Sequence, residues 1–224
     1  GLGAGTRLAV GNYFTALAYG GRDGVTLKPD VIYAAKGSQA LALETYTTGT
    51  AADFTTRNVP GASEILDVVL DPDDWQTAYV IDSQKVYQTT DAGVNWDVIS
   101  DKLAAIDLKS LEIVKTPGGD KVLLVGASQG VYRAINPVVD VEWTELGSGL
   151  PNVLVRDIDF GNRLGTTDDV LLAGTMGRGA WTLAGDADSV LELESQIVIG
   201  GTSGDDEVLI RRNPDNASLL DILI

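Results

Sequence analysis

The sequence predicts an all-β fold, a β-propeller built from four-stranded antiparallel blades. A short apolar run that ends in small residues recurs about every 45 residues. Its copies occupy residues 31–37, 77–83, 122–128 and 170–176 and are centred on Tyr33, Tyr79, Leu124 and Leu172. A repeat of this length made of strand-like pieces is typical of propellers, which place one blade in each repeat. No stretch carries a sustained period of 3.6 residues, so we expect a chain that is nearly all β.

Each apolar run has companion strands at constant offsets. The strands expected before the four runs are residues 15–19, 65–70, 108–114 and 155–160, and those expected after them are residues 40–43, 85–88, 130–133 and 179–182. A fourth strand is expected near Phe54, Trp96 and Trp143. Residues 108–114 and 155–160 alternate with period two, which indicates strands with two unlike faces. Turn-forming residues separate the first two strands of a blade, and we expect Asp71, Asp73 and Asp74 to shape one such turn.

The repeats do not complete a ring of the usual size. Three full blades and three strands of a fourth occupy roughly residues 14–184, so about 3.5–4 blades are present, whereas propellers close with about 4–8. Residues 6–11 are predicted to be a strand of a further blade. We therefore favour part of a larger ring over a small ring that closes alone. An open half-ring exposes strand edges, which predicts self-association.

Composition excludes several classes of protein. The chain has 224 residues, with 32 acidic against 16 basic residues and a formal net charge of −16. Nucleic acids and anionic membranes need basic partners, so neither is expected to bind. The chain contains no Cys and no His, which excludes disulfides, thiolate nucleophiles, His-based triads and His-ligated zinc. No apolar run approaches the ~20 residues that span a bilayer, and the first residues do not resemble a signal peptide.

Residues 89–96, Thr-Thr-Asp-Ala-Gly-Val-Asn-Trp, resemble the Asp-box, S/T-x-D-x-G-x-T-W. The matching residues are Thr89, Asp91, Gly93 and Trp96. Asn95 departs from the usual Thr. Residues 173–181 are also similar to the AGT-x-GRG-x-W signature that ends many such propellers. The resemblance implies an Asp-box (BNR-repeat) propeller, a family that includes sialidases, sortilin-type receptors and xyloglucan hydrolases, and in which the box is structural and lies away from the ligand.

The C-terminal part carries a different pattern. Residues 197–210 resemble an entry repeat of RTX-type calcium β-rolls with one extra residue. Asp205 and Asp206 offer carboxylates that suit Ca²⁺, whereas an ordinary β-turn between residues 192–199 and 207–212 is the alternative. We expect a propeller part at residues 1–187 and the start of a following module at residues 188–224. The resemblance implies a multidomain parent that is secreted or lies at the cell surface.

Candidate ligand-binding residues come from the turns between the second and third strands, on the usual ligand face of a propeller. They are Gln39, Gln84, Gln129 and Arg178. Three of these turns contain Ser-Gln, which provides amide groups for a sugar or a peptide, while repeat-derived turn sequence is the alternative. Trp75 is either an exposed aromatic contact or a staple of its own turn. No catalytic residue is assigned, because no facing pair of carboxylates stands out and no sialidase-like Arg-Ile-Pro segment is found.

The function expected first is a non-catalytic binding or structural module that contacts an unknown glycan or protein and is adhesive in character. The second hypothesis is a fragment of an extracellular glycoside hydrolase, and the third is a self-associating assembly protein. No cofactor is expected apart from Ca²⁺ at Asp205 and Asp206. Fold and repeats do not choose among these hypotheses, since one fold supports unrelated activities.

Overall fold

The computed structural model describes residues 13–43, 55–105, 107–138, 140–146, 152–162, 169–185, 190–191, 209–212 and 220–223. The chain divides into two compact units, Gly1–Glu194 and Ser195–Ile224. The expected domain boundary after residue 187 stays a prediction. The named secondary-structure elements of the described part of the chain, β1 to β19, are all strands. No helix in this part is long and apolar enough to cross a membrane.

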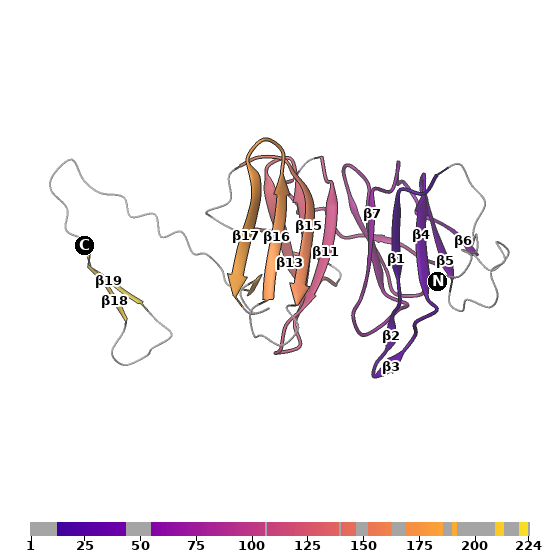
Figure 1. Cartoon of the computed structure of the whole chain (residues 1–224), viewed down its shortest axis with the longest axis horizontal. Coiled ribbons are helices and arrows are strands. Elements are labelled where there is room, and N and C mark those ends of the chain that lie inside the picture. The colour runs from indigo at the N-terminus through magenta and orange to yellow at the C-terminus, as the bar shows by residue number, and fades with distance from the viewer. Residues whose placement is uncertain are drawn as a thin grey trace, which may run out of the picture. The chain divides into compact units, whose positions relative to one another are not determined.

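In its described residues, the first unit contains four antiparallel sheets of three or four strands, which we call blades 1 to 4 (Figure 1). Blade 1 comprises β1 (Ala16–Tyr19), β4 (Ile32–Lys36), β5 (Gln39–Leu43) and β6 (Thr55–Asn58). Blade 2 comprises β7 (Asp67–Leu70), β8 (Ala78–Ile81), β9 (Val86–Thr89) and β10 (Asp97–Val98). Blade 3 comprises β11 (Ser110–Lys115), β12 (Lys121–Ala127), β13 (Gly130–Ile135) and β14 (Thr144–Leu146). Blade 4 comprises β15 (Val155–Asn162), β16 (Asp169–Thr175) and β17 (Gly179–Gly185).

The predicted fold class is confirmed, and the runs predicted for the four blades correspond to strands in the described part of the chain. The strands predicted at residues 6–11 and 192–199 lie outside the described residues. The first strand of every blade pairs with the second, the second with the third, and the third with the fourth where a fourth is described. The fourth strands begin immediately after Trp96 and Trp143. Phe54 lies outside the described residues, and β6 begins at Thr55.

The first strands of successive blades lie side by side, β1 against β7, β7 against β11 and β11 against β15 (Figure 1). We call these four strands the inner strands, because each is the edge of its sheet nearest the neighbouring sheets. Alternation along them decides which blade each side chain faces. In β11, Leu111 packs into the core shared with blade 2, whereas Val114 packs into the core shared with blade 4. Three such cores lie between the four blades.

A small hairpin that the repeat pattern does not predict interrupts blade 1. It consists of β2 (Arg22–Asp23) and β3 (Thr26–Leu27), and Gly24 in its turn has a φ of +57°. The sequence signal for it is the Asp23-Gly24 pair, which favours tight hairpin turns. The hairpin contacts the turn of blade 2 that joins β7 to β8. The Gly24 amide donates to the Asp73 carbonyl at 2.8 Å, and the Trp75 amide donates to the Arg22 carbonyl at 2.7 Å.

The second unit is described by one hairpin, in which β18 (Leu209–Arg212) pairs antiparallel with β19 (Leu220–Leu223). β18 lies within the strand predicted at residues 207–212. β19 has no counterpart among the predicted strands, because the repeat pattern ends before it.

Candidate functional site

Two carboxylates on the inner strands reach across to the next blade. Asp67 of β7 accepts a hydrogen bond from the Leu111 amide of β11 at 2.7 Å. Glu112 of β11 accepts one from the Phe160 amide of β15 at 3.3 Å. Each inner strand is a sheet edge whose outward amides lack a partner in their own sheet, and an unpaired amide is costly when water is excluded. The carboxylates supply that partner.

These two carboxyl groups are perturbed in the same direction. Burial raises the pKa of Glu112 to about 7, and the charges of Asp159 and Asp67 add to the increase. Burial also raises the pKa of Asp67, although hydrogen bonds from the Leu111 and Val68 amides oppose this. Glu112 is therefore divided between its neutral and charged forms near neutral pH, so it can donate as well as accept hydrogen bonds.

An open pocket of about 460 Å³ lies on the inner strands of blades 1 to 3. Its apolar wall includes Leu27 of the small hairpin, Leu70 of β7 and Ile113 of β11. Its polar lining includes Arg22 and Glu112. The pocket thus combines apolar surface with an exposed guanidinium and a carboxyl of raised pKa, a combination typical of ligand sites.

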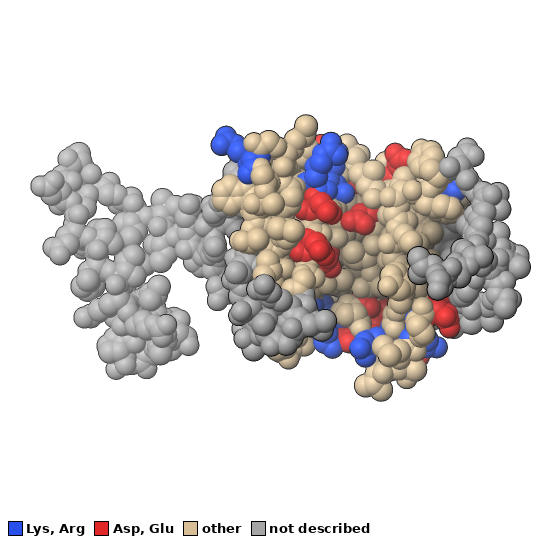
Figure 2. All heavy atoms as spheres, in the orientation of Figure 1, with Lys and Arg blue, Asp and Glu red and all other residues tan. Residues whose placement is uncertain are grey.

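The inner-strand face is acidic. Figure 2 shows acidic side chains gathered over the middle of this face, with basic side chains toward its two ends. Asp157 and Asp159 of β15 are exposed, and their charges act on Asp67 and Glu112 respectively. Within the described residues, no group of three or more acidic side chains is arranged to hold a metal ion.

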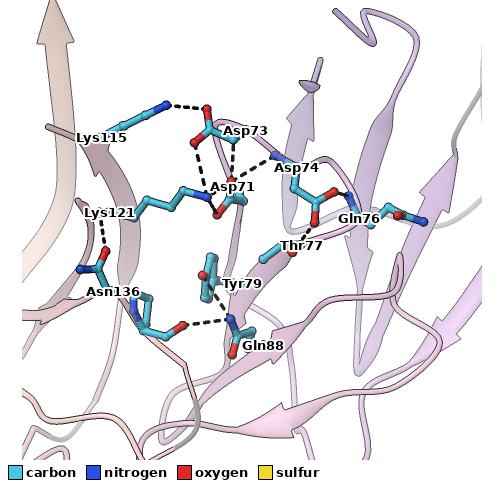
Figure 3. Close-up of polar contacts among 11 residues, drawn as sticks. Asp71, Asp73, Asp74, Gln76, Thr77, Tyr79, Gln88, Lys115, Lys121 and Asn136 are labelled. Carbon is cyan, nitrogen blue, oxygen red and sulfur yellow. Dashed lines mark hydrogen bonds and ion pairs between the residues drawn. The ribbon is translucent and has the colours of Figure 1, made fainter. Parts of the chain in front are cut away.

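Figure 3 shows a polar network that joins the first turns of blades 2 and 3. Asp71 is buried, and its Oδ1 accepts hydrogen bonds from the Asp73 and Asp74 amides at 2.8 and 3.1 Å. Lys121 of blade 3 contacts both Asp71 oxygens at 2.7 Å. Burial alone would lower the pKa of Lys121, but the hydrogen bond and charge of Asp71 raise it. These contacts give the turn carboxylates a role in joining blades.

A second set of polar contacts between blades 2 and 3 lies beneath the turn (Figure 3). Gln88 donates from Nε2 to the Tyr79 hydroxyl at 3.2 Å and to the Pro137 carbonyl at 3.0 Å. Burial and the nearby charge of Asp71 raise the pKa of Tyr79 to about 12, which keeps its hydroxyl protonated. Tyr79 is the centre of the second repeat, so the repeat motif contributes to joining blades as well as to the core.

The residues that resemble an Asp-box form a turn between β9 and β10, and the Ala92 amide ties this turn to the Gln76 carbonyl at 2.8 Å. Asp91 accepts hydrogen bonds from the Asn95 amide at 2.8 Å and from the Thr89 hydroxyl at 2.9 Å. Ala92 and Gly93 both have positive φ, at 57° and 80°. The Trp96 indole donates to the Gly93 carbonyl at 3.0 Å. Asn95, the departure from the motif, adds a side-chain bond to Asp91 at 2.6 Å.

The predicted ligand-binding residues lie at the turns between second and third strands, and none of them lines the pocket on the inner strands. Gln84, Gln129 and Arg178 are exposed. Gln39 is half-buried and donates to the Asn58 side chain at 3.2 Å. Their role as a ligand face stays a prediction. Asp205 and Asp206 lie outside the described residues.

The two alternatives for Trp75 are resolved in favour of the staple. Its side chain is buried, and its carbonyl accepts a hydrogen bond from the Tyr33 hydroxyl at 3.0 Å. The indole packs in the core between blades 1 and 2.

The sequence analysis did not identify Asp67 and Glu112 as candidate site residues. The sequence feature that could have identified them is that each carboxylate lies within a predicted strand and is flanked on both sides by apolar residues.

Comparison with known proteins supports the fold. No protein-family model matches the chain, and no curated protein matches it. Among solved structures, the chain is similar to an ancestral GH74 enzyme, with a TM-score of 0.54 and 16% identity, over 77% of this chain and 25% of that one. It is also similar to the GH74 xyloglucanase from Xanthomonas campestris, with a TM-score of 0.48 and 13% identity, over 92% of this chain and 34% of that one. The chain therefore spans a quarter to a third of these enzymes, which are glycoside hydrolases of the propeller type.

Proposed function

We propose that this chain is a binding module of a propeller protein and that the inner-strand pocket takes an uncharged, hydroxyl-rich ligand such as a saccharide. The observation that carries the proposal is Glu112, a half-buried carboxyl of raised pKa in an open pocket with Arg22 and apolar side chains. Neutral hydroxyl groups need donors and acceptors together, and Glu112 offers both near neutral pH. Leu27 and Ile113 provide apolar surface for the carbon-bound faces of a sugar ring.

The acidic surroundings favour a neutral ligand over an anionic one. The chain carries a formal net charge of −16, and the pocket lies on the face where Asp157 and Asp159 are exposed. An anionic ligand would be repelled by this field at low ionic strength. Similarity to a glycoside hydrolase in fold supports a saccharide over a peptide.

The test is titration calorimetry of the whole chain with cellohexaose, maltohexaose and xyloglucan oligosaccharides. Arg22→Ala combined with Leu27→Ala should weaken binding at least tenfold, equal to about 1.4 kcal/mol. Gln84→Ala combined with Gln129→Ala is the matched control and should leave binding unchanged. Loss of binding in the control pair alone would instead place the site at the turns between second and third strands. Absence of binding to all three probes would overturn the proposal.

Hydrolysis of a glycan is a second candidate function, and one observation favours it. Glu112 has the raised pKa expected of a general acid, and it is influenced by the carboxylates of Asp67 and Asp159 on adjacent strands. Release of reducing ends from the oligosaccharides, abolished in Glu112→Gln, would support catalysis. Binding without such release would support the module alone.

We also propose that the protein acts outside the cell or at its surface. The similarity in sequence to Asp-box propellers, together with the fold similarity to a glycoside hydrolase, supports this location. Detection of the native protein in the culture medium or on intact cells, rather than in the cytoplasmic fraction, is the measurement that checks it.

A further inference from the structure

Each inner strand pairs with the second strand of its own blade in a corresponding register. Residues of different inner strands can therefore be matched position by position. Strand pairing with the second strand of each blade aligns Ala16 and Ala18 in blade 1 with Asp67 and Val69 in blade 2, Ser110 and Glu112 in blade 3, and Asp157 and Asp159 in blade 4. Asp67, Val69 and Glu112 face the following blade, as their contacts show. Asp157 and Asp159 occupy the same two positions in blade 4.

At the internal interfaces these positions carry the acceptors for the next inner strand. Asp67 accepts the Leu111 amide at 2.7 Å, and Glu112 accepts the Phe160 amide at 3.3 Å. In each case the donor follows the residue that is equivalent to the acceptor. Leu111 follows Ser110, which is equivalent to Asp67, and Phe160 follows Asp159, which is equivalent to Glu112. The internal interfaces therefore follow one rule, in which a carboxylate from one blade binds an edge amide of the next.

Blade 4 has carboxylates at the acceptor positions, but no following blade covers them in the described part of the chain. Asp157 and Asp159 are exposed, and Leu172 pairs with Asp159 on the same face of the sheet. The residues equivalent to Leu172 in blades 2 and 3, Tyr79 and Leu124, are buried, whereas Leu172 is 40% exposed. This face of blade 4 has the composition of an interface between blades.

The inner strand of blade 1, β1, has residues at the positions that donate backbone amides in blades 3 and 4. By the same register Leu17 is equivalent to Leu111 and Tyr19 to Phe160. Leu111 is 3% exposed and Phe160 packs in a core, but Leu17 is 66% and Tyr19 80% exposed. Ala16 and Ala18, which alternate with them, pack toward blade 2, so Leu17 and Tyr19 face away from it.

We propose that a second copy of this chain docks head to tail, with blade 1 of one copy on the exposed face of blade 4 of the other. Asp157 then accepts the Leu17 amide of the second copy, and Asp159 accepts the Tyr19 amide. The Leu17 and Tyr19 side chains cover Leu172. Two copies make two identical interfaces related by a two-fold axis, and together they close a ring of eight blades, within the usual range of about 4–8.

A second copy is the occupant that the observations favour, because both halves of the interface lie in one chain and match the internal interfaces position by position. The charge of −16 on each copy opposes association at low ionic strength. Salt that screens this repulsion should therefore strengthen the dimer.

The absence of Cys from the chain allows a direct test by disulfide cross-linking. The doubly substituted chain Tyr19→Cys with Asp159→Cys is oxidised, and its mass is measured without reductant. The expected product is a covalent dimer, a doubling of mass. Val138→Cys with Asp159→Cys is the matched control, since Val138 is 63% exposed but lies in blade 3 between β13 and β14, and it should stay monomeric. Tyr19→Cys alone and Asp159→Cys alone should also stay monomeric.

Three results of the cross-linking experiment would overturn the proposal. A cross-link within a single chain would show that four blades close on themselves. A ladder of longer multiples would show an open filament, and efficient linking of the Tyr19→Cys variant alone would show face-to-face pairing. As an independent measurement, light scattering of the unsubstituted chain should give the mass of two copies, and Leu17→Asp with Tyr19→Asp should reduce it to one while circular dichroism still shows folded β-structure. A monomeric unsubstituted chain would equally overturn the proposal.

Discussion

Asp91 shows how one side chain can determine the shape of a turn. It accepts hydrogen bonds from Asn95 and Thr89, and two residues with positive φ follow it directly. Burial alone would raise the pKa of Asp91, but the bonds from the Asn95 amide and side chain hold the pKa below its usual value. The ionised form therefore stabilises the fold above the pKa of an unfolded Asp, and this contribution is lost as the pH falls through the folded-state value.

We predict that Asp91→Ala lowers the free energy of unfolding by about 1–3 kcal/mol, because amides in the turn lose their acceptor. Asp97→Ala, an exposed residue in β10, is the control and should change stability by less than about 0.5 kcal/mol. Urea denaturation of both variants measures the difference. Loss of saccharide binding in a fully stable Asp91→Ala protein would contradict the structural role.

Glu112 gives the chain a pH dependence of the opposite sign. Its folded-state pKa of about 7 lies above the value of about 4.3 for an unfolded Glu. The folded state therefore binds protons more readily, and stability is greatest below the unfolded pKa and falls as the pH rises through about 7. Asp67, whose pKa is also raised, acts in the same direction.

We predict that Glu112→Gln raises the free energy of unfolding at pH 8 relative to the unsubstituted chain and flattens its decrease between pH 5 and pH 8. The reason is that an uncharged amide avoids the cost of burying a charge beside Asp67 and Asp159. Denaturation at several pH values is the measurement, with Glu145→Gln, an exposed residue of β14, as control. A destabilised Glu112→Gln protein at pH 8 would show that the hydrogen bond to Phe160 outweighs the charge.

At the scale of elements, two lysines contact the same turn in different surroundings. Lys121 at the start of β12 binds the buried Asp71, whose side chain is 4% exposed. Lys115 at the end of β11 binds Asp73 at 2.7 Å, where the two side chains are 42% and 33% exposed. Ion pairs in solvent contribute little, whereas removing the partner of a buried carboxylate leaves an uncompensated charge.

We predict that Lys121→Met lowers the free energy of unfolding by about 2 kcal/mol, whereas Lys115→Met lowers it by less than about 1 kcal/mol. The two substitutions remove the same charge and keep a similar apolar stem, so each serves as the control for the other. Equal losses for the two variants would show that burial of Asp71 does not determine the strength of this contact between blades.

At the scale of the whole molecule, the second compact unit, Ser195–Ile224, contains a proposed site of its own. We propose that Asp205 and Asp206 contribute to weak Ca²⁺ binding. Calorimetry at ~10 mM Ca²⁺, above the millimolar range typical of extracellular modules, should show heat that Asp206→Ala abolishes. Asp221→Ala is the control and should keep the signal. Absence of heat in the unsubstituted chain would leave the segment as a turn between strands.

The sequence by itself determined the fold class and the strands of the four blades, though not the β2–β3 hairpin or β19, because the repeat and the alternation are local properties of the chain. The spacing of Tyr33, Tyr79, Leu124 and Leu172 predicted about 3.5–4 blades, and these residues occupy equivalent places in the pairing of first and second strands. The turn at Asp91 was equally predictable, since all its partners lie within four residues.

Only the tertiary structure decided which residues form the pocket and the contacts between blades. Asp67 and Leu111, or Glu112 and Phe160, are more than 40 residues apart and meet because inner strands of successive blades lie side by side. The raised pKa of Glu112 likewise comes from burial by those neighbouring strands. Local patterns fix which face of a strand is apolar, but the environment of a polar residue on that face depends on the next blade, which no local pattern specifies.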